Sequence, residues 1–516
     1  MCGRIDRTHE GLASLQFDTG GCYHSPFYAA PRSHPLRVKQ GAVLLLLTFG
    51  TFLVHGYHPY VEDAEIYLPG IEKTLHPELF PRNAQFFESH AGLTLFPNLM
   101  ASLIRISHLP MDWVLLLLQF AAIFLLLLAC WQLSGQCFTD ANARWAGVGL
   151  MAALLTLPVA GTCLYVMDQY TNPRNLAAFA CVFAVTRVLQ KKYVGAAVWL
   201  IFAFAVHPLM PVYTVSFCVL LVLLEKYQPG WANFAAAVSL GSLFEKPTEA
   251  YHQAAVLHSY HYVTRWEWYE LLGAVAPIAI FWWFSRIARA HRMRNLDLLS
   301  RALIIYDIVY LAAALALAIP ARFEGLARLQ PMRSLHLLYM LMIVMGGGLL
   351  GQFVLQNKAW RWFVLFVPLC LGMHIAQHQL FSDTAHLELP WQAPKNAWVQ
   401  AFLWIRDHTP VDAYFALDPD HMELPGEDQH GFRAIAERSM LADRTKDSGA
   451  VSMFPPLAET WLAQVQARQG WKNFQADDFR RLRADYGADW VVVQNPAASG
   501  LECPYSNLAV SVCRIP

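Results

Sequence analysis

The sequence GAVLLLLTFGTFLVHGYHPYVEDAEIYLPGI, residues 41–71, joins a long apolar run directly to a charged segment. The apolar run approaches the roughly 20 residues that cross a bilayer as a helix, which indicates a membrane span. The charged residues of the segment that follows it, 58–87, include Glu62, Asp63, Glu65, Glu72, Lys73 and Arg82. Charged side chains are costly at membrane depth, so we expect this segment to lie at one face of the membrane and to form part of a site there.

The composition of the chain is that of a membrane protein. Of its 516 residues, 56% are hydrophobic and 15% are charged, whereas about 25% of the residues in an average soluble protein are charged. The formal net charge is zero, so we expect no nucleic acid partner. Residues 1–40 are polar and basic and show no pattern of a cleavable signal peptide. They are predicted to be a disordered cytoplasmic leader before an uncleaved first span.

Apolar runs recur along residues 41–380. We predict about eleven spans, at 41–57, 113–134, 145–164, 175–189, 193–206, 208–225, 231–244, 269–287, 302–320, 335–356 and 360–378. The run 93–108 is interrupted by Pro97, Asn98 and Arg105, and we expect it to be a helix lying along the membrane surface. The predicted fold class is a mainly α, polytopic helical membrane protein.

The distribution of basic residues predicts the orientation of these spans. The connections that this arrangement assigns to the cytoplasm carry about twice as many Lys and Arg residues as those assigned to the outside, as the positive-inside rule requires. The amino terminus is therefore predicted to be cytoplasmic. The first outer loop, 58–110, and residues 381–516 are predicted to lie on the extracytoplasmic side of an inner (plasma) membrane.

Residues 381–516 have the pattern of a soluble α/β domain. WVQAFLWIRDHTPVDAYFALDP, 398–419, shows a helical apolar period, a turn and then a strand-like run, and DDFRRLRADYGADWVVVQNP, 477–496, repeats that order. Cys503 and Cys513 flank PYSNLAVSV, a predicted closing hairpin. In an oxidising compartment the two cysteines would form a disulfide; two free thiols are an equally good interpretation.

The predicted topology gathers polar residues on the outer side. They are Glu62, Asp63, Glu65, Asp168, Asn172, Arg174, His207, His252, His258, His261, Arg265, Arg322, Glu324, Arg328 and Arg333. Carboxylates beside guanidinium groups suit a site that binds an anionic substrate and moves a proton. Ionisable residues clustered at one face of a membrane domain therefore indicate a functional site.

Each of these residues also has a structural interpretation. Glu62 and Asp63 are typical N-terminal residues for a helix that starts near residue 64, and His207 before Pro208 is more often part of a tight turn. The three histidines between 252 and 261 lack a close spacing with a fourth ligand, which argues against zinc. The arginines of 321–333 are also typical of side chains that reach from a span to the membrane surface.

Three segments give the chain a resemblance to a known class. VEDAEIY (61–67) is an acidic motif at the start of the first outer loop, GLTLFPNLMASLIRISHL (92–109) is a surface helix, and residues 381–516 form an outer domain. This arrangement resembles the GT-C class of membrane glycosyltransferases. EDAEIYLPGI (62–71), the His-Pro pair at 207–208, WIRDHTPVDAYF (404–415) and GFRAIAERSMLADRTKD (431–447) are similar to a little-characterised bacterial subset of that class.

The resemblance implies an inverting transfer of a sugar from a polyprenyl-phosphate carrier to a glycan, lipid or protein acceptor. It implies Asp63 or Glu62 as the general base, and Arg333 with Arg328, Arg322 and Arg174 as ligands of the lipid phosphate. The residues expected to support them are Asp168, His207, His261 and Arg265. Because no second acidic pair follows in a later outer loop, we expect no required metal, although some members of the class use a divalent ion.

A non-enzymatic function is the competing prediction. Transporters show internal repeats and helices broken by Gly or Pro, and no convincing repeat relates the two halves of this chain. The nearest break is MGGGLLGQ, 345–352, which is equally typical of close helix packing. A lipid-handling scaffold with a GT-C-like fold and no catalysis is the third possibility.

Overall fold

The computed structural model describes residues 38–226, 248–318, 326 and 328–516. The predicted leader up to residue 37, the predicted span at 231–244 and Arg322 lie outside the described residues. The elements named below therefore belong to the described part of the chain.

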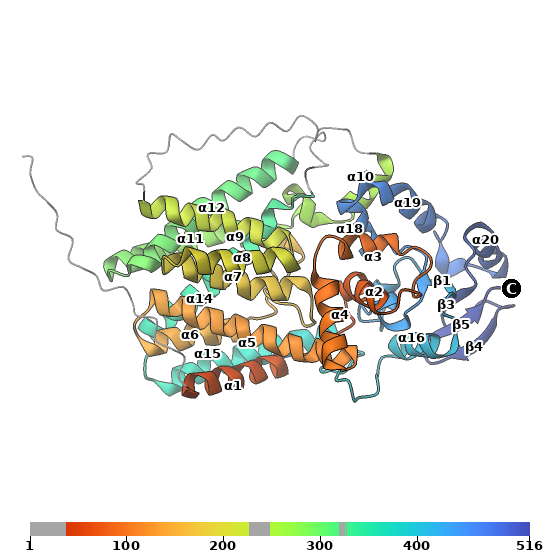
Figure 1. The fold of residues 1–516 in the computed structure, drawn as a ribbon, viewed down its shortest axis with the longest axis horizontal. Helices are drawn as coiled ribbons and strands as arrows, with labels where there is room; N and C mark the ends of the chain where they lie inside the picture. Colours follow the sequence, from red (N-terminus) through yellow and green to blue (C-terminus); the bar gives the residue numbers. More distant parts are fainter. Residues whose placement is uncertain (1–37, 227–247, 319–325, 327) are drawn as a thin grey trace, which may run out of the picture. The chain divides into compact units, whose positions relative to one another are not determined.

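Seven of the described helices are long and apolar enough to cross a membrane. They are α1 (Val38–His55), α5 (Met111–Cys137), α9 (Leu209–Lys226), α11 (Trp268–Ala290), α12 (Arg294–Ala318), the helical run Pro331–Leu355 that contains α14 (Leu335–Leu350), and α15 (Ala359–Leu380). A shorter apolar helix, α8, spans Tyr193–Val206. These helices confirm the predicted fold class, a mainly α polytopic membrane protein (Figure 1).

The predicted span at 145–164 is wrong in its second half. The helix in this region, α6, covers Ala141–Ala153 and ends there. Pro158 has no backbone N–H to continue a helix, and the chain turns back on itself, with the Val159 N–H donating to the Leu164 carbonyl over 2.8 Å. The next helix, α7, begins only at Pro173 and runs to Leu189. Residues 154–172 are therefore an irregular loop.

The Gly-rich stretch at 345–352 continues as helix and does not break the span. If Gly347 carried a side chain, its first carbon would lie only 2.7 Å from the Ala146 carbonyl oxygen of α6. A larger residue at Gly347 would therefore push α14 and α6 apart. This geometry supports the helix-packing interpretation of the stretch.

The segment 58–110 contains three helices, α2 (Ala64–Leu75), α3 (Gln85–Ala91) and α4 (Phe96–Ser107). The helix expected within 93–108 is present as α4. Its twelve residues extend only about 18 Å at 1.5 Å per residue, too short for a bilayer about 30 Å thick. Phe96 and Met100 are buried on one face, whereas Ile106 is exposed. That α4 lies along the membrane surface stays a prediction.

The C-terminal part of the chain, residues 381–516, contains the expected helix–strand units. α16 (Ala397–His408) precedes β1 (Tyr414–Ala416), and α20 (Ala476–Tyr486) precedes β3 (Trp490–Gln494). Gly487 ends α20 in the left-handed conformation that glycine adopts readily. Both predicted repeats are therefore confirmed.

The strands form one five-stranded sheet in the order β2-β1-β3-β5-β4 (Figure 1). β2 (Ser439–Met440) and β3 both pair with β1 in parallel, whereas β5 (Val510–Arg514) pairs antiparallel with β3 and with β4 (Glu502–Ser506). The β4–β5 hairpin carries Cys503 and Cys513, which are joined as a disulfide. The other helices of this region are α17 (Phe432–Ala436), α18 (Lys446–Met453) and α19 (Ala458–Gln466). A short helix, α10 (Glu249–Val256), lies between α9 and α11.

The segment 58–110 and the C-terminal part are joined by backbone hydrogen bonds. The Glu62 N–H donates to the Gln429 carbonyl over 2.8 Å, and the Gly431 N–H donates to the Tyr60 carbonyl over 2.8 Å. Gly431 is required by this close approach, since a side-chain carbon there would lie 2.6 Å from the Oε2 atom of Glu65. The C-terminal part thus packs directly on the turn that carries Glu62 and Asp63, called the acidic turn below.

Candidate functional site

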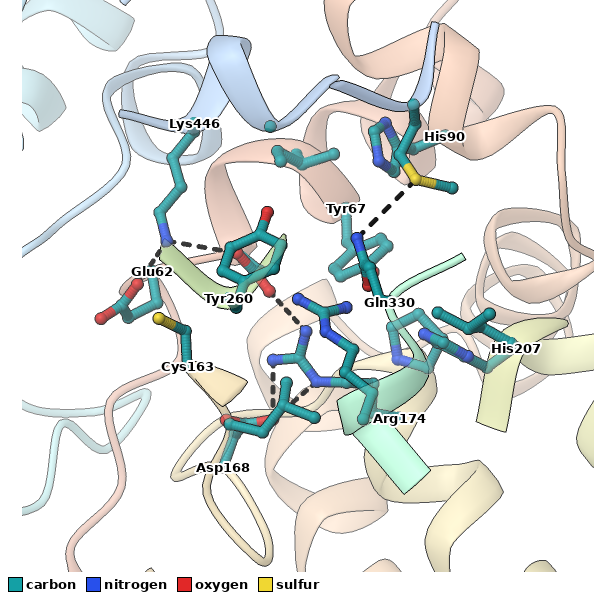
Figure 2. Close-up of a pocket in the computed structure, with 18 of the residues that line it drawn as sticks. Glu62, Tyr67, His90, Cys163, Asp168, Arg174, His207, Tyr260, Gln330 and Lys446 are labelled. Carbon is teal, nitrogen blue, oxygen red and sulfur yellow. Dashed lines mark hydrogen bonds and ion pairs between the residues drawn. The ribbon is translucent and has the colours of Figure 1, made fainter. Parts of the chain in front are cut away.

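A cavity of about 470 Å³ lies between the acidic turn, the loop 154–172 and α18 (Figure 2). Of the residues predicted for the site, it is lined by Glu62, Asp63, Asp168, Arg174, His207 and Arg333. In the view of Figure 2, Lys446 and Glu62 lie to the left, His207 lies to the right, and Arg174 lies between them. Residues far apart in the sequence are therefore gathered around one space.

Asp63 occupies the N-cap position of α2, but its side chain makes no capping hydrogen bond. Its Oδ2 atom instead accepts a hydrogen bond from Arg174 Nη1 over 2.6 Å, and its Oδ1 atom accepts one from Lys446 Nζ over 3.2 Å. The interpretation of Asp63 as a helix cap does not hold for its side chain. Burial alone would raise the pKa of Asp63, but Lys446 and Arg174 outweigh it and hold the pKa well below its usual range.

Arg174 is placed by the first turn of α7. Asn172 caps this helix by accepting from the Asn175 N–H over 2.9 Å, and Pro173 takes the first helical position. The Arg174 guanidinium also pairs with Asp168, with Nη2 lying 3.0 Å from Oδ2. Arg174 therefore joins two carboxylates, Asp63 and Asp168, at the wall of the cavity.

Lys446, the first residue of α18, is the contribution of the C-terminal part to the charged wall. Its amino group donates to Oε2 of Glu62 as well as to Asp63. Burial alone would lower the pKa of Lys446, but Glu62 and Asp63 raise it above its usual range. Lys446 therefore carries a positive charge at neutral pH, and its side chain is only 12% exposed.

Arg333 lines another part of the cavity. Its guanidinium lies over the ring of Tyr260, 4.7 Å from the ring centre, a cation–π contact. Its Nε atom has no hydrogen-bond partner among the described residues. None of the ion pairs within the described part of the chain includes Arg333, in contrast to Arg174 and Lys446. Arg333 is thus a cation at the cavity whose charge no described carboxylate balances.

Three histidines, His90, His207 and His258, line the cavity. Burial lowers the pKa of both His90 and His258 to about 4, so both are uncharged at neutral pH. His258 is held by a 2.9 Å hydrogen bond between its Nε2 atom and the Ser448 hydroxyl of α18. The Nδ1 atom of His207 accepts from the Met210 N–H over 3.4 Å, so His207 closes the turn after α8 and also faces the cavity.

Three of the predicted residues are not brought to the cavity. Arg265 is exposed and directs Nη1 to the Val256 carbonyl, and His261 packs against the ring of Tyr260. Arg328 is half-buried and does not line the cavity. The physical reason is that a predicted position on one side of the membrane does not determine the direction in which each side chain points.

No group of His, Cys, Asp and Glu in the described ranges is arranged to hold a metal ion. The carboxylates at the cavity are engaged by protein cations. Glu62 and Asp63 both contact Lys446, and Asp63 and Asp168 both contact Arg174. The histidines at 252, 258 and 261, which the spacing argued against as a zinc site, form no such group in the structure.

A second ion cluster does not line the cavity. The Oε1 atom of Glu65 accepts from Arg433 Nη1 over 3.1 Å, and its Oε2 atom accepts from the Arg433 backbone N–H over 2.8 Å. Arg433 also pairs with Asp447 over 2.6 Å and lies 3.8 Å from Asp443. All four side chains are almost completely buried, so this cluster connects α2, α17 and α18 away from solvent.

Lys446, Tyr260 and His90 are site residues that the sequence interpretation did not assign. Lys446 does fall within GFRAIAERSMLADRTKD, which contributed to the resemblance, and this is the one signal that pointed to it. Its ion pair with Glu62 connects residues 384 positions apart. No local spacing or periodicity reports a contact of that range.

Comparisons with known proteins reveal a distant structural similarity. No protein-family model matches the chain, and no curated protein matches its sequence. Among solved structures, the chain is similar to the archaeal oligosaccharyltransferase AglB from Archaeoglobus fulgidus, in a complex with an inhibitory peptide and a dolichol-phosphate. The TM-score is 0.41 with 12% sequence identity, over 88% of this chain and 69% of that chain. The function is therefore argued below from the cavity itself.

Proposed function

We propose that this chain is a membrane glycosyltransferase that takes a sugar from a polyprenyl-phosphate carrier and transfers it to an acceptor hydroxyl outside the cytoplasm. The observation that carries the proposal is the cavity. It places Arg333, a cation that no carboxylate among the described residues balances, and a carboxylate pair, Glu62 and Asp63, around one space. A transfer from a phosphate carrier needs both a cation for the phosphate and a carboxylate for the proton.

The lipid phosphate would bind to Arg333. A phosphate oxygen makes strong charge-assisted hydrogen bonds to a guanidinium group, and the Nε atom of Arg333 has no partner among the described residues. As the bond from the sugar to the phosphate oxygen breaks, that oxygen keeps the electron pair. Arg333 stabilises the negative charge that develops there.

The acceptor hydroxyl would attack the anomeric carbon and pass its proton to Asp63 or Glu62. The low pKa of Asp63 makes it a weak base while Lys446 and Arg174 are both paired with it. An anionic donor in the cavity would draw one of these cations toward its phosphate. Losing a cationic partner raises the pKa of Asp63, so donor binding itself would prepare the base.

The proposal is tested with purified protein in nanodiscs and a panel of radiolabelled polyprenyl-phosphate sugars. We expect the wild type to bind at least one donor and Arg333→Gln to bind it about 10- to 100-fold more weakly, the size of one lost charged hydrogen bond. The matched control is Arg105→Gln, an arginine of α4 that donates to the Thr74 carbonyl and does not line the cavity. Its donor affinity should equal that of the wild type.

Two results would count against the proposal. If the wild type binds and consumes none of the carriers, a transporter or lipid-handling scaffold becomes the better interpretation. If Arg333→Gln and Arg105→Gln weaken donor binding equally, the phosphate of the donor does not bind to Arg333.

A further inference from the structure

The amino group of Lys446 lies between two carboxylates that face the cavity. It donates to Oε2 of Glu62 and to Oδ1 of Asp63, in the latter case over 3.2 Å. The other oxygen of Asp63 pairs with Arg174 over 2.6 Å. Figure 2 shows Lys446 reaching from α18 to the turn that carries Glu62. Both oxygens of Asp63 and one oxygen of Glu62 are thus bound by protein cations.

A divalent metal ion would need these same oxygen atoms. Mg²⁺ and Mn²⁺ bind proteins through carboxylate oxygens, and an adjacent acidic pair that faces a cavity is a favourable starting point for such a site. Here an ammonium group lies between the two carboxylates, and a guanidinium group takes the remaining oxygen of Asp63. The residues as folded do not fit a divalent ion, in agreement with the lack of a metal-binding group among the described residues.

Lys446 is held in place by the protein and is not a mobile surface lysine. Its backbone N–H donates to Oδ1 of Asp443 over 2.5 Å. The next residue, Asp447, pairs with the buried Arg433, which in turn pairs with Glu65 of α2. Lys446 is therefore connected, through its neighbour Asp447 and Arg433, to the helix that follows Glu62 and Asp63.

We propose that Lys446 is a built-in cation of this site, which occupies the position between Glu62 and Asp63 that a divalent metal ion would otherwise take. The C-terminal part of the chain then supplies the charge that balances the acidic turn. Lys446 also prevents divalent ions from binding to the pair. The proposal concerns ion binding, so it stands or fails independently of sugar transfer.

The test is an isothermal titration calorimetry experiment, in which Mn²⁺ is titrated into the full chain in nanodiscs of zwitterionic lipid. The protein carries no affinity tag. Lys446→Met keeps most of the side-chain volume and removes the charge. We expect this variant to bind one Mn²⁺ with a dissociation constant at least about tenfold lower than that of the wild type. The control is Lys73→Met, since Lys73 donates to the carbonyls of Leu79 and Phe80 away from the cavity.

Further variants keep the test decisive. Lys446→Arg retains a cation and should bind Mn²⁺ no better than the wild type, and Lys446→Met combined with Glu62→Gln should lose the gained binding. The proposal is overturned if folded Lys446→Met gains no Mn²⁺ binding. It is also overturned, however the lysine variants fold, if the wild type binds Mn²⁺ saturably and Glu62→Gln abolishes that binding.

Discussion

Two ion clusters each join the segment 58–110 to the C-terminal part, one of them with Arg174 of α7 as a further member, and they differ in what they face. The open cluster joins Glu62 and Asp63 to Lys446 and Arg174 at the cavity, and the Asp63 side chain is 25% exposed. The closed cluster joins Glu65 to Arg433, with Asp447 and Asp443, and the Glu65 side chain is 0% exposed. Residues two or three positions apart in one turn therefore enter different environments.

The difference separates charges that hold the fold from charges that are available to a ligand. In the closed cluster, the oxygens of Glu65 accept hydrogen bonds from the Arg433 guanidinium and backbone N–H, and the side chain is fully buried, so a ligand does not reach it. In the open cluster, the side chains line a space of about 470 Å³. We therefore expect the closed cluster to determine stability and the open cluster to determine binding and turnover.

The largest effect is expected from breaking the closed cluster with Arg433→Met. The substitution leaves Glu65, Asp443 and Asp447 buried without their cation, and removing one partner of a buried ion pair costs about 3–5 kcal/mol. We expect unfolding at a much lower temperature, measured by tryptophan fluorescence. The control is Arg444→Ala, which removes a half-exposed pair with Asp420 and should cost no more than about 1 kcal/mol. If both variants lose the same stability, the closed cluster does not contribute more to the fold than an exposed ion pair does.

The open cluster is tested by Asp63→Asn. We expect a folded protein that retains donor binding and loses about 100-fold or more of its turnover, as when a general base is removed. Turnover of the radiolabelled donor is the measurement. Asp407→Asn, at an exposed aspartate paired with Arg406, should leave turnover unchanged. Full activity in Asp63→Asn would remove Asp63 from the reaction.

A smaller effect is expected where the two segments approach most closely, at Gly431→Ala. The added carbon would lie 2.6 Å from Oε2 and 2.9 Å from Cβ of Glu65, so the two segments must move apart. Crowding of this kind costs about 1–3 kcal/mol, measured as a lower unfolding temperature. Gly372→Ala in α15, where nothing lies within 4 Å of the added carbon, should be neutral or slightly stabilising. If Gly431→Ala also leaves the unfolding temperature unchanged, the two segments can move apart at this contact without a loss of stability.

The smallest effect is expected in the pH dependence of the closed cluster. Burial raises the pKa of Glu65 to about 8, with Arg433 opposing and Asp443 and Asp447 adding to it. Between the ordinary pKa of glutamate and pH 8, the folded state then holds a proton that the unfolded state has lost, so this contribution to stability falls as pH rises. The difference in unfolding temperature between wild type and Glu65→Gln should shrink by about 2 °C or more from pH 5 to pH 8. If the difference in unfolding temperature stays constant from pH 5 to pH 8, Glu65 does not titrate in this range.

The sequence was informative wherever a local pattern decides the outcome. Apolar length predicted the long helices, and the repeated helix–turn–strand order predicted the α16–β1 and α20–β3 units. The residues between Leu154 and Asn172 were predicted less well, because their apolar composition suits a span whereas Pro158 ends the helix. Hydropathy reports how many residues in a segment are apolar, but it does not report whether the backbone can continue as a helix.

The site was predicted in part because a predicted topology assigns charged residues to one side of the membrane but does not determine where their side chains point. Asp63, Arg174 and Arg333 reach the cavity, whereas Arg265 turns to the Val256 carbonyl. Lys446 was missed because its partners lie 383 and 384 positions away along the chain. A contact of this kind follows from the packing of the C-terminal part on the acidic turn, which no local pattern reports.

The ion pair between Lys446 and the acidic turn also has a consequence for biosynthesis. Glu62 and Asp63 leave the ribosome hundreds of residues before the lysine that neutralises them, so during membrane insertion the nascent chain carries an unbalanced acidic pair. The site is assembled only after α18 has been translated and has docked. A chain that terminates before residue 446 is therefore expected to lack the ion pairs that balance Glu62 and Asp63.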